Sequence, residues 1–322
     1  MDIADQYRII IAGAGWADNT ARGRLRFDGT DRASFLQALL TNEVAAIPPG
    51  AGTYALYLTP QGRMVADLRV FVGAEAIFAD VPVELAASLA GKLDGLIFAE
   101  DVRVTDITQT SLECAVFGAG APEVLGRAFG LDPGAVGDLP TWAHLPIDDG
   151  FVARTDEVAE GSWEIWTLGP SAPDVRMALE AAGAVKLSAE LLEGLRIDAG
   201  RPRFGIDMTT ETIPLEVGLL DRAISQTKGC YVGQEVIIRV LHRGGGRVAK
   251  RLVRLTCEGS DVPAIGDAVM ADGAEVGRVT SAAWSPRVRS VVALAYVHRD
   301  AAEPGRAVEI AAASAVITGL AG

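Results

Sequence analysis

The octapeptide Lys228-Gly229-Cys230-Tyr231-Val232-Gly233-Gln234-Glu235 places a cysteine between glycines, directly ahead of a helical pattern. Apolar residues recur at helical spacing over 236–241, and Gly244 is expected to end the helix. Unpaired N–H groups at a helix start and the nearby Lys228 both favour an anion. A lone cysteine is more often a buried, inert one. The flanking glycines and charged residues nevertheless favour Cys230 as a presented, ionisable thiol.

A buried acidic residue is expected upstream of this octapeptide. Residues 189–199 are predicted to form a helix with Ser188 as its N-cap and Gly200 beyond its end. Asp198 follows Leu195 by three positions, so it lies on the apolar stripe of that helix. A carboxylate there must be paired or bound to a ligand. Two interpretations stay open, namely an ion pair with an arginine at 196, 201 or 203, and a bound ligand.

A hairpin is predicted nearer the N-terminus. Residues 54–58 and 64–71 are β-rich, and Thr59-Pro60-Gln61-Gly62-Arg63 joins them with proline and glycine at the positions that a turn prefers. On the second strand, Asp67 shares one face with Phe71 and also with Arg69. Its carboxylate therefore either points inward or forms a surface pair with Arg69.

The remaining patterns predict an α+β protein in three parts. Strand and helix runs recur in both halves of residues 1–244, which suggests two similar α+β units, and a Gly- and Pro-rich stretch over 118–150 marks their boundary. Short alternating strands over 251–255, 275–280, 291–297 and 307–310 indicate a small antiparallel β-barrel. The predicted domains are 1–118, 119–244 and 245–322.

Two further local patterns lie in the N-terminal part of the chain. The run Ile9 to Gly15 resembles a strand entering a dinucleotide loop, but Asp18 occupies the sixth position of that fingerprint and no apolar helix follows, so we reject a Rossmann fold. Asp31 is expected to cap a helix, and Cys114 is expected in the core of a strand over 112–117.

Composition narrows the function classes. The chain has 322 residues, 49% of them hydrophobic, and no membrane-length apolar run, and from its first residues we expect no secretory signal. Its formal charge of -13 disfavours nucleic acid as a partner. Three scattered cysteines and three scattered histidines predict neither a disulfide framework nor a metal site, and a Cys230–His242 dyad is disfavoured by spacing. We expect a cytoplasmic protein. Its basic stretch from Arg239 to Arg251 is interpreted either as a site for a small anion or an acidic partner, or as a solvated surface.

Several motifs together resemble one known family. The segment Arg196–Asp207, then Ile213-Pro214-Leu215-Glu216 and the octapeptide, resembles the YgfZ family of folate-binding proteins, which is related to the glycine-cleavage T-protein, an aminomethyltransferase. Thr41-Asn42-Glu43 and the turn Thr59–Arg63 match the same pattern, so the resemblance covers nearly the whole chain. It implies two α+β folate-binding units and a C-terminal barrel around a tetrahydrofolate site.

The resemblance also implies residue roles. Cys230 stands at the position of the family's critical thiol, with Lys228 beside it. Asp198 stands where aminomethyltransferases carry a longer acidic residue that binds the pterin. We also assign Asn42 and Arg239 to folate binding.

Departures from the T-protein pattern leave the function open. Cys230 replaces an aspartate, whereas Ala66-Asp67 replaces an Asp-Asp pair, so the catalytic carboxylate can survive as Asp67. The leading hypothesis is a tetrahydrofolate-binding accessory protein for the assembly or repair of iron-sulfur enzymes, which uses Cys230. The alternative is a folate-dependent aminomethyl- or methyltransferase that uses Asp67, and a third class is a folate sensor without chemistry. The expected partners are reduced folate and iron-sulfur client proteins, with no nucleic acid or membrane, and the protein is expected to be a monomer.

Overall fold

The computed structural model of the protein describes residues 1–169, 175–242 and 245–322. The chain divides into two compact units, and neither is continuous in sequence. Unit 1 comprises Met1–Tyr57, Ala66–Leu187 and Ser225–Tyr231, and unit 2 comprises Leu58–Val65, Ser188–Ile224 and Val232–Gly322. The predicted domain limits at 118 and 244 stay a prediction.

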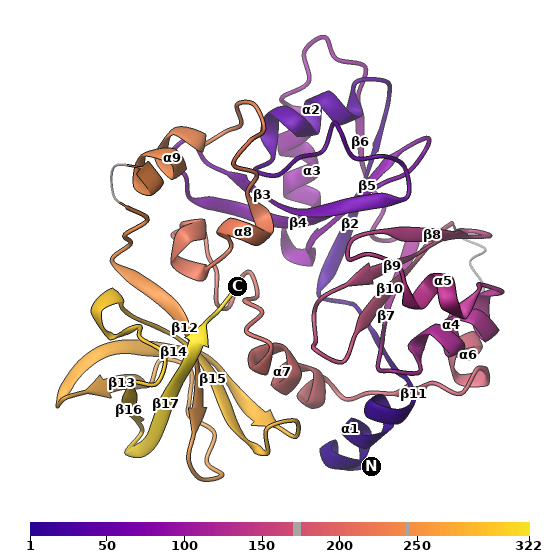
Figure 1. Cartoon of the computed structure of the whole chain (residues 1–322). Helices are drawn as coiled ribbons and strands as arrows, with labels where there is room; N and C mark the ends of the chain where they lie inside the picture. The colour runs from indigo at the N-terminus through magenta and orange to yellow at the C-terminus, as the bar shows by residue number, and fades with distance from the viewer. Residues whose placement is uncertain (170–174, 243–244) are drawn as a thin grey trace. The chain divides into compact units, whose positions relative to one another are not determined.

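A five-stranded sheet has the order β3-β4-β5-β2-β6 (Figure 1). Every residue of β5 is buried, as are all but one of β4, which explains why both strands have nearly unbroken apolar sequences. Charged side chains on these strands therefore need buried partners. The strands are β2 Arg22–Asp28, β3 Ala51–Leu58, β4 Met64–Val72, β5 Ile77–Pro82 and β6 Arg103–Asp106, and the intervening helices are α2 Arg32–Leu39, η1 Val83–Leu85 and α3 Ala86–Asp94.

The predicted hairpin between β3 and β4 is confirmed. The Thr59 N–H donates to the Arg63 carbonyl at 2.8 Å, and the Gly62 N–H donates to the Thr59 carbonyl at 2.8 Å. Gly62 has a φ of 74°, which glycine adopts without a steric cost. A Cβ at this position would also lie 3.0 Å from the side chain of Val236, so the turn and the chain at 236 approach each other closely.

A six-stranded sheet in unit 1 has the order β11-β1-β7-β10-β9-β8. Its apolar core includes Trp16, Trp163 and Cys114, and the predicted burial of Cys114 is confirmed. Strands β1 and β7 precede residue 118, yet β1 pairs with β11 and β7 pairs with β10, both of which follow it. The strands are β1 Gly15–Asp18, β7 Ser111–Phe117, β8 His144–Ile147, β9 Gly150–Thr155, β10 Ser162–Leu168 and β11 Val185–Lys186, and the associated helices are α1 Ile3–Ala12, α4 Ala121–Phe129, α5 Pro133–Gly137 and α6 Val175–Ala181.

Unit 2 contains a closed antiparallel barrel, so the predicted barrel is confirmed (Figure 1). The strands run around it in the order β12-β15-β14-β13-β16-β17. Side chains of β17 alternate between buried and exposed, as expected for a barrel wall. The strands are β12 Lys250–Cys257, β13 Ala268–Ala271, β14 Ala274–Ser285, β15 Ser290–His298, β16 Ala307–Ile310 and β17 Ala313–Leu320, and the helices of unit 2 are α7 Ala189–Asp198, η2 Pro214–Val217, α8 Leu220–Ala223, α9 Gln234–His242 and η3 Arg299–Ala301.

The local predictions have mixed outcomes. Helix α7 is capped by Ser188, whose hydroxyl accepts the Leu191 N–H, as predicted. The run Ile9 to Gly15, which looked strand-like, instead lies largely in α1, whose start is fixed by the Asp2 carboxylate accepting the Asp5 N–H. Asp31 precedes α2, but its carboxylate accepts the Asp101 N–H at 2.9 Å instead of capping the helix. Helix α9 is confirmed, whereas its predicted end at Gly244 lies outside the described residues.

None of the helices in the described ranges combines the length and the apolarity that crossing a membrane requires.

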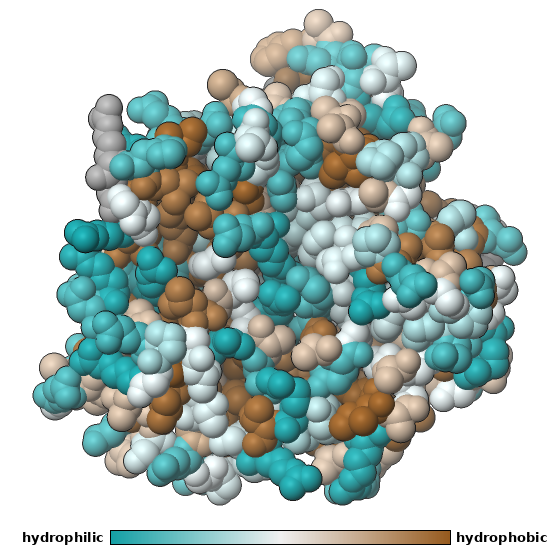
Figure 2. Space-filling view, viewed as in Figure 1, coloured by the Kyte–Doolittle hydropathy of each residue, from teal (hydrophilic) through white to brown (hydrophobic). Residues whose placement is uncertain are grey.

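Figure 2 shows hydrophobic side chains gathered where Figure 1 places α9. Ile238 on that helix is 42% exposed. The predicted cytoplasmic location stays a prediction.

Candidate functional site

Asp67 on β4 is a buried carboxylate held by three hydrogen bonds. Only 5% of the residue is exposed. Arg22 at the start of β2 donates through Nη1 to Oδ1 and Oδ2, at 3.2 and 3.0 Å, and the Tyr54 hydroxyl donates to Oδ2 at 3.1 Å. Of the two interpretations left open by the sequence, the structure therefore shows the inward one, and the surface pair with Arg69 is wrong.

Arg22 joins Asp67 to a second carboxylate. Its Nε and Nη2 donate to Oδ1 of Asp80 on β5, at 3.0 and 2.5 Å. Burial alone would lower the pKa of Arg22, but the carboxylates of Asp67 and Asp80 outweigh that effect and raise it. The guanidinium therefore stays charged and fixes the Asp67 carboxylate from one side.

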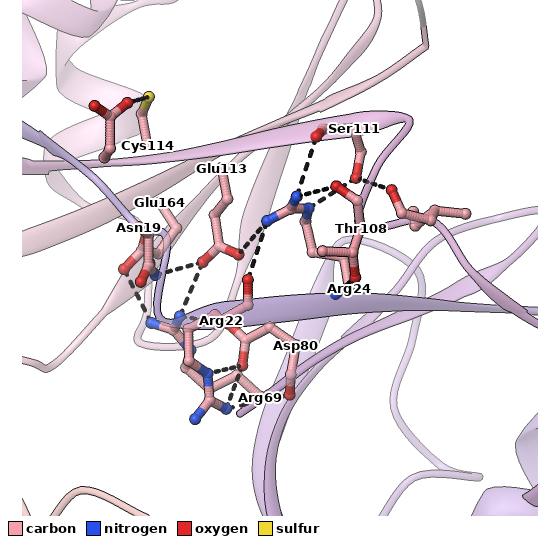
Figure 3. A network of polar contacts seen from close by, with 12 residues as sticks. Asn19, Arg22, Arg24, Arg69, Asp80, Thr108, Ser111, Glu113, Cys114 and Glu164 are labelled. Carbon is pink, nitrogen blue, oxygen red and sulfur yellow. Dashed lines mark hydrogen bonds and ion pairs between the residues drawn. The ribbon is translucent and has the colours of Figure 1, made fainter. Parts of the chain in front are cut away.

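Arg69 is the centre of a buried ion network in unit 1 (Figure 3). It lies opposite Asp80 in the β4–β5 register and forms an ion pair with it. It also donates to Glu113 on β7 and Glu164 on β10, both at 2.9 Å. Burial and the negative charge of Asp80 raise the pKa of Glu113 well above its ordinary value. The network thus favours a proton on Glu113, because its carboxylates crowd together in a buried space.

A chain of hydrogen bonds connects three of the predicted site residues within unit 1. The Asn42 amide donates to the Tyr54 carbonyl at 3.0 Å, and the Tyr54 hydroxyl contacts Asp67. The Lys228 ammonium in turn donates to the Asn42 carbonyl at 2.9 Å. Asp67, Asn42 and Lys228 therefore come together around Tyr54, a residue that the sequence analysis did not single out.

Lys228 anchors the segment that carries Cys230. Its ammonium also donates to the carbonyls of Gln37 and Leu40, at 2.7 and 2.6 Å, near the C-terminal end of α2. Burial lowers the pKa of Lys228 to about 8, although the Glu43 carboxylate opposes that shift. Cys230 lies two residues further on and is exposed. The three carbonyls occupy the three N–H donors of Lys228, and the predicted role of Lys228 beside the thiol stays a prediction.

Asp198 in unit 2 is also buried and paired. It is 8% exposed at the end of α7. The Ser285 hydroxyl donates to its Oδ2 at 2.9 Å, and Arg287 donates through Nε to Oδ2 at 2.5 Å and through Nη2 to Oδ1 at 2.6 Å. An ion pair was one of the two interpretations, but its expected partners were wrong. Arg196, for example, binds Glu193 and Asp207 instead.

Arg239 lies on α9 in unit 2 with its side chain exposed. Its predicted contact with folate stays a prediction, as does that of Asn42.

Arg22, Tyr54 and Arg287 were not predicted from the sequence as site residues. A signal existed for Arg22, because Arg22, Arg24 and Arg26 alternate along one short strand. Three cations on one face of a strand indicate buried acidic partners from another element. Arg287 lies 89 residues from Asp198 in a turn, where no local pattern marks it.

The comparisons with known proteins agree with this fold. Residues 2–228 match the family model described as the GCVT N-terminal domain, and residues 250–318 match the glycine cleavage T-protein C-terminal barrel domain. The fold is similar to a solved structure, the glycine cleavage system aminomethyltransferase T from Bartonella henselae. The two superpose with a TM-score of 0.87 at 20% identity, over 99% of this chain and 88% of that one. At that identity the likeness shows the fold alone.

Relatives with known names are similar over most of their length. An aminomethyltransferase of Geobacillus kaustophilus (strain HTA426) is 29% identical over 320 residues, which is 96% of this chain and 85% of the relative. A putative chloroplastic transferase of Arabidopsis thaliana is 29% identical over 296 residues, which is 89% of this chain and 66% of the relative. Because the N-terminal model alone matches more than half of the residues, the chain belongs to the glycine-cleavage T-protein family.

Proposed function

We propose that this protein binds a reduced folate and transfers a one-carbon group, of the aminomethyl or methyl class, with Asp67 as its acidic residue. The observation that carries the proposal is the buried Asp67 carboxylate, held by Arg22 and Tyr54. The names of the similar aminomethyltransferases support the same class of reaction. The sequence alone had favoured an iron-sulfur role, and the comparisons favour the alternative.

The residues around Asp67 fit a reduced folate chemically. The reduced pteridine ring presents N–H and amino donors, and a carboxylate is their natural acceptor. Among the described residues, Oδ1 of Asp67 accepts one hydrogen bond, from Arg22, and a carboxylate oxygen can accept two. When bound, tetrahydrofolate would supply the nitrogens that receive the one-carbon group. Asp67 would hold an N–H of the reacting partner, while Arg22 and Tyr54 keep the carboxylate oriented.

Asp198 is the proposed carboxylate for the pterin edge. A pterin presents its amino group and a neighbouring ring N–H side by side, as a guanidinium presents two parallel N–H groups. In this structure the Arg287 guanidinium already binds both carboxylate oxygens of Asp198. Pterin binding at Asp198 therefore requires Arg287 to leave, and the turn between β14 and β15 is where that change would occur.

A transfer assay with tetrahydrofolate tests the proposal. We expect Asp67→Asn to lower the rate of one-carbon transfer by about 100-fold or more, because the charged acceptor at the reacting group is lost. Glu84→Gln, an exposed acid of the same unit, serves as the matched control and should leave the rate unchanged. Cys230→Ala should also leave it unchanged. An Asp67→Asn rate within about threefold of wild type would contradict the role of Asp67.

A second candidate function is supported by the exposure of Cys230. Burial raises the pKa of the other two thiols, to about 12 for Cys114 and about 11 for Cys257, so both are poor nucleophiles. An exposed thiol on an anchored segment suits a factor of the YgfZ type that acts on iron-sulfur client proteins. We expect Cys230→Ala to fail, and Cys257→Ala to succeed, in restoring iron-sulfur enzyme activities to cells that lack the protein. Full restoration by Cys230→Ala would exclude this function.

A further inference from the structure

An arginine-lined pocket lies in unit 2 and includes the C-terminal part of the basic stretch from Arg239 to Arg251. Its volume is about 320 Å³, and its lining comprises Arg247, Val248, Arg251, Arg299 and Asp300. The Val248 side chain is buried, whereas Arg247 and Arg299 are exposed and Arg251 is half-buried. The pocket thus combines an apolar residue with three cationic side chains.

Strand pairing in the barrel brings these arginines together. Arg251 at the start of β12 lies opposite Val297 near the end of β15. The chain then continues into η3, where the Arg299 N–H donates to the Ala249 carbonyl at 3.1 Å. Arg299 and Arg251 therefore lie side by side although 48 residues separate them in sequence.

The positive charge of the pocket is only partly compensated. Arg299 Nε lies 3.4 Å from Oδ1 of Asp300, and both side chains are substantially exposed, so this pair contributes little. Among the described residues, no hydrogen bond or ion pair is recorded for the side chains of Arg247 and Arg251. Three guanidinium groups face one carboxylate in a protein whose formal charge is -13. A cationic pocket on an acidic protein attracts anions locally.

We propose that this pocket binds a small molecule that carries at least two oxyanion groups, either phosphates or carboxylates. A guanidinium group binds a phosphate or a carboxylate through two parallel hydrogen bonds, which favours such ligands over chloride. The volume lies at the lower limit of small-molecule pockets and exceeds what a single phosphate fills. The two sources of this chemistry are a phosphorylated small molecule and a chain of γ-linked glutamates of the kind that extends from folates. The inference does not depend on the proposed transfer reaction.

Calorimetric titration of the full-length protein tests the inference with two probes, inorganic pyrophosphate and free tri-γ-glutamate. We expect at least one probe to bind with a dissociation constant in the millimolar range or below, and the binding to weaken as NaCl is added. Tighter binding of pyrophosphate identifies a phosphorylated ligand, and tighter binding of tri-γ-glutamate identifies a glutamate chain.

Matched variants locate the site. Arg251→Gln and Arg299→Gln should each weaken binding of the better probe by about tenfold, because each removes a charge-assisted contact. Arg278→Gln, an exposed arginine on the same barrel, should leave it unchanged. Unchanged melting temperatures establish that the variants fold. Failure of both probes to bind, or equal binding by wild type and both pocket variants, would overturn the inference.

Discussion

Asp67 in unit 1 and Asp198 in unit 2 are each held by an arginine and a hydroxyl, but Arg22 uses one nitrogen for the Asp67 carboxylate whereas Arg287 uses two for that of Asp198. Their arginines differ. The Arg22 side chain is 14% exposed, lies on a strand and also binds Asp80, which belongs to the Arg69 network. The Arg287 side chain is 37% exposed and lies in a turn.

This difference separates a fixed carboxylate from an exchangeable one. Moving Arg22 would leave the buried Asp67 carboxylate without a cation and Asp80 with Arg69 alone, which is strongly unfavourable. Moving Arg287 into water costs less, because its guanidinium is already partly hydrated. Under the proposed function, this difference suits Asp67 to a constant chemical role and Asp198 to a ligand that displaces a side chain.

The largest expected effect tests how firmly unit 1 is fixed. Arg69→Met should lower the free energy of unfolding by about 3–5 kcal/mol, because it leaves Asp80, Glu113 and Glu164 buried without their shared cation. Urea denaturation measures the change. Arg103→Met, whose side chain is 75% exposed, should cost less than about 1 kcal/mol. Similar values for the two variants would show that the network does not hold unit 1 together.

The pH dependence of stability sharpens the same point. The folded-state pKa of Glu113 is raised above its unfolded value, so its contribution is fully present below pH 4.5 and is lost as pH rises towards the folded-state pKa. One such group changes the free energy of unfolding by at most about 1.4 kcal/mol per pH unit. In the Glu113→Gln variant, this loss of stability between pH 5 and 8 should disappear. Urea denaturation at a series of pH values measures it. Parallel pH profiles for wild type and Glu113→Gln would contradict the proton on Glu113.

Arg287→Ala tests whether Asp198 is exchangeable. Removing the competing guanidinium should strengthen binding of tetrahydrofolate by about tenfold, which is about 1.4 kcal/mol, as measured by calorimetry. The control is Asp198→Ala, which should weaken binding. Weaker binding by Arg287→Ala would mean that the arginine supports the ligand instead of excluding it.

The smallest expected effect concerns the hydroxyl on Asp67. Tyr54→Phe removes one hydrogen bond to a buried carboxylate and should cost about 1 kcal/mol in the free energy of unfolding. Tyr57→Phe on the same strand is a suitable control, because its hydroxyl makes no hydrogen bond recorded among the described residues. Equal losses in the free energy of unfolding for both variants would show that the Tyr54 hydroxyl does not stabilise the Asp67 carboxylate.

The sequence predicted those parts of the fold that depend on local signals. The β3–β4 turn carries proline and glycine at defined positions, α7 has its serine cap, and the barrel strands β12, β14, β15 and β16 alternate, so these elements were located from the sequence. Strands β13 and β17 escaped because they are rich in alanine and small residues, which give a weak β signal. The strand-like run of isoleucines in α1 shows that an N-cap and tertiary packing override intrinsic preference.

The candidate site was predicted less completely than the fold. Asp67 and Asp198 were identified because an acidic residue on an apolar face is conspicuous in sequence. Their arginines were not, because Arg22 and Arg287 lie 45 and 89 residues away and reach the carboxylates only after strands have paired. Partners of buried charges are set by tertiary register, which single-sequence patterns do not contain.

The discontinuous make-up of the two units has a consequence for synthesis on the ribosome. The chain passes between them five times, so unit 1 is complete only when residue 231 has been made, and unit 2 requires the last strand of the barrel. The earliest segments, including the β4 strand that carries Asp67, must therefore wait for much later ones before their charges are buried. Nascent chains should therefore expose Arg69 and its carboxylates until Ser111–Leu168 has emerged.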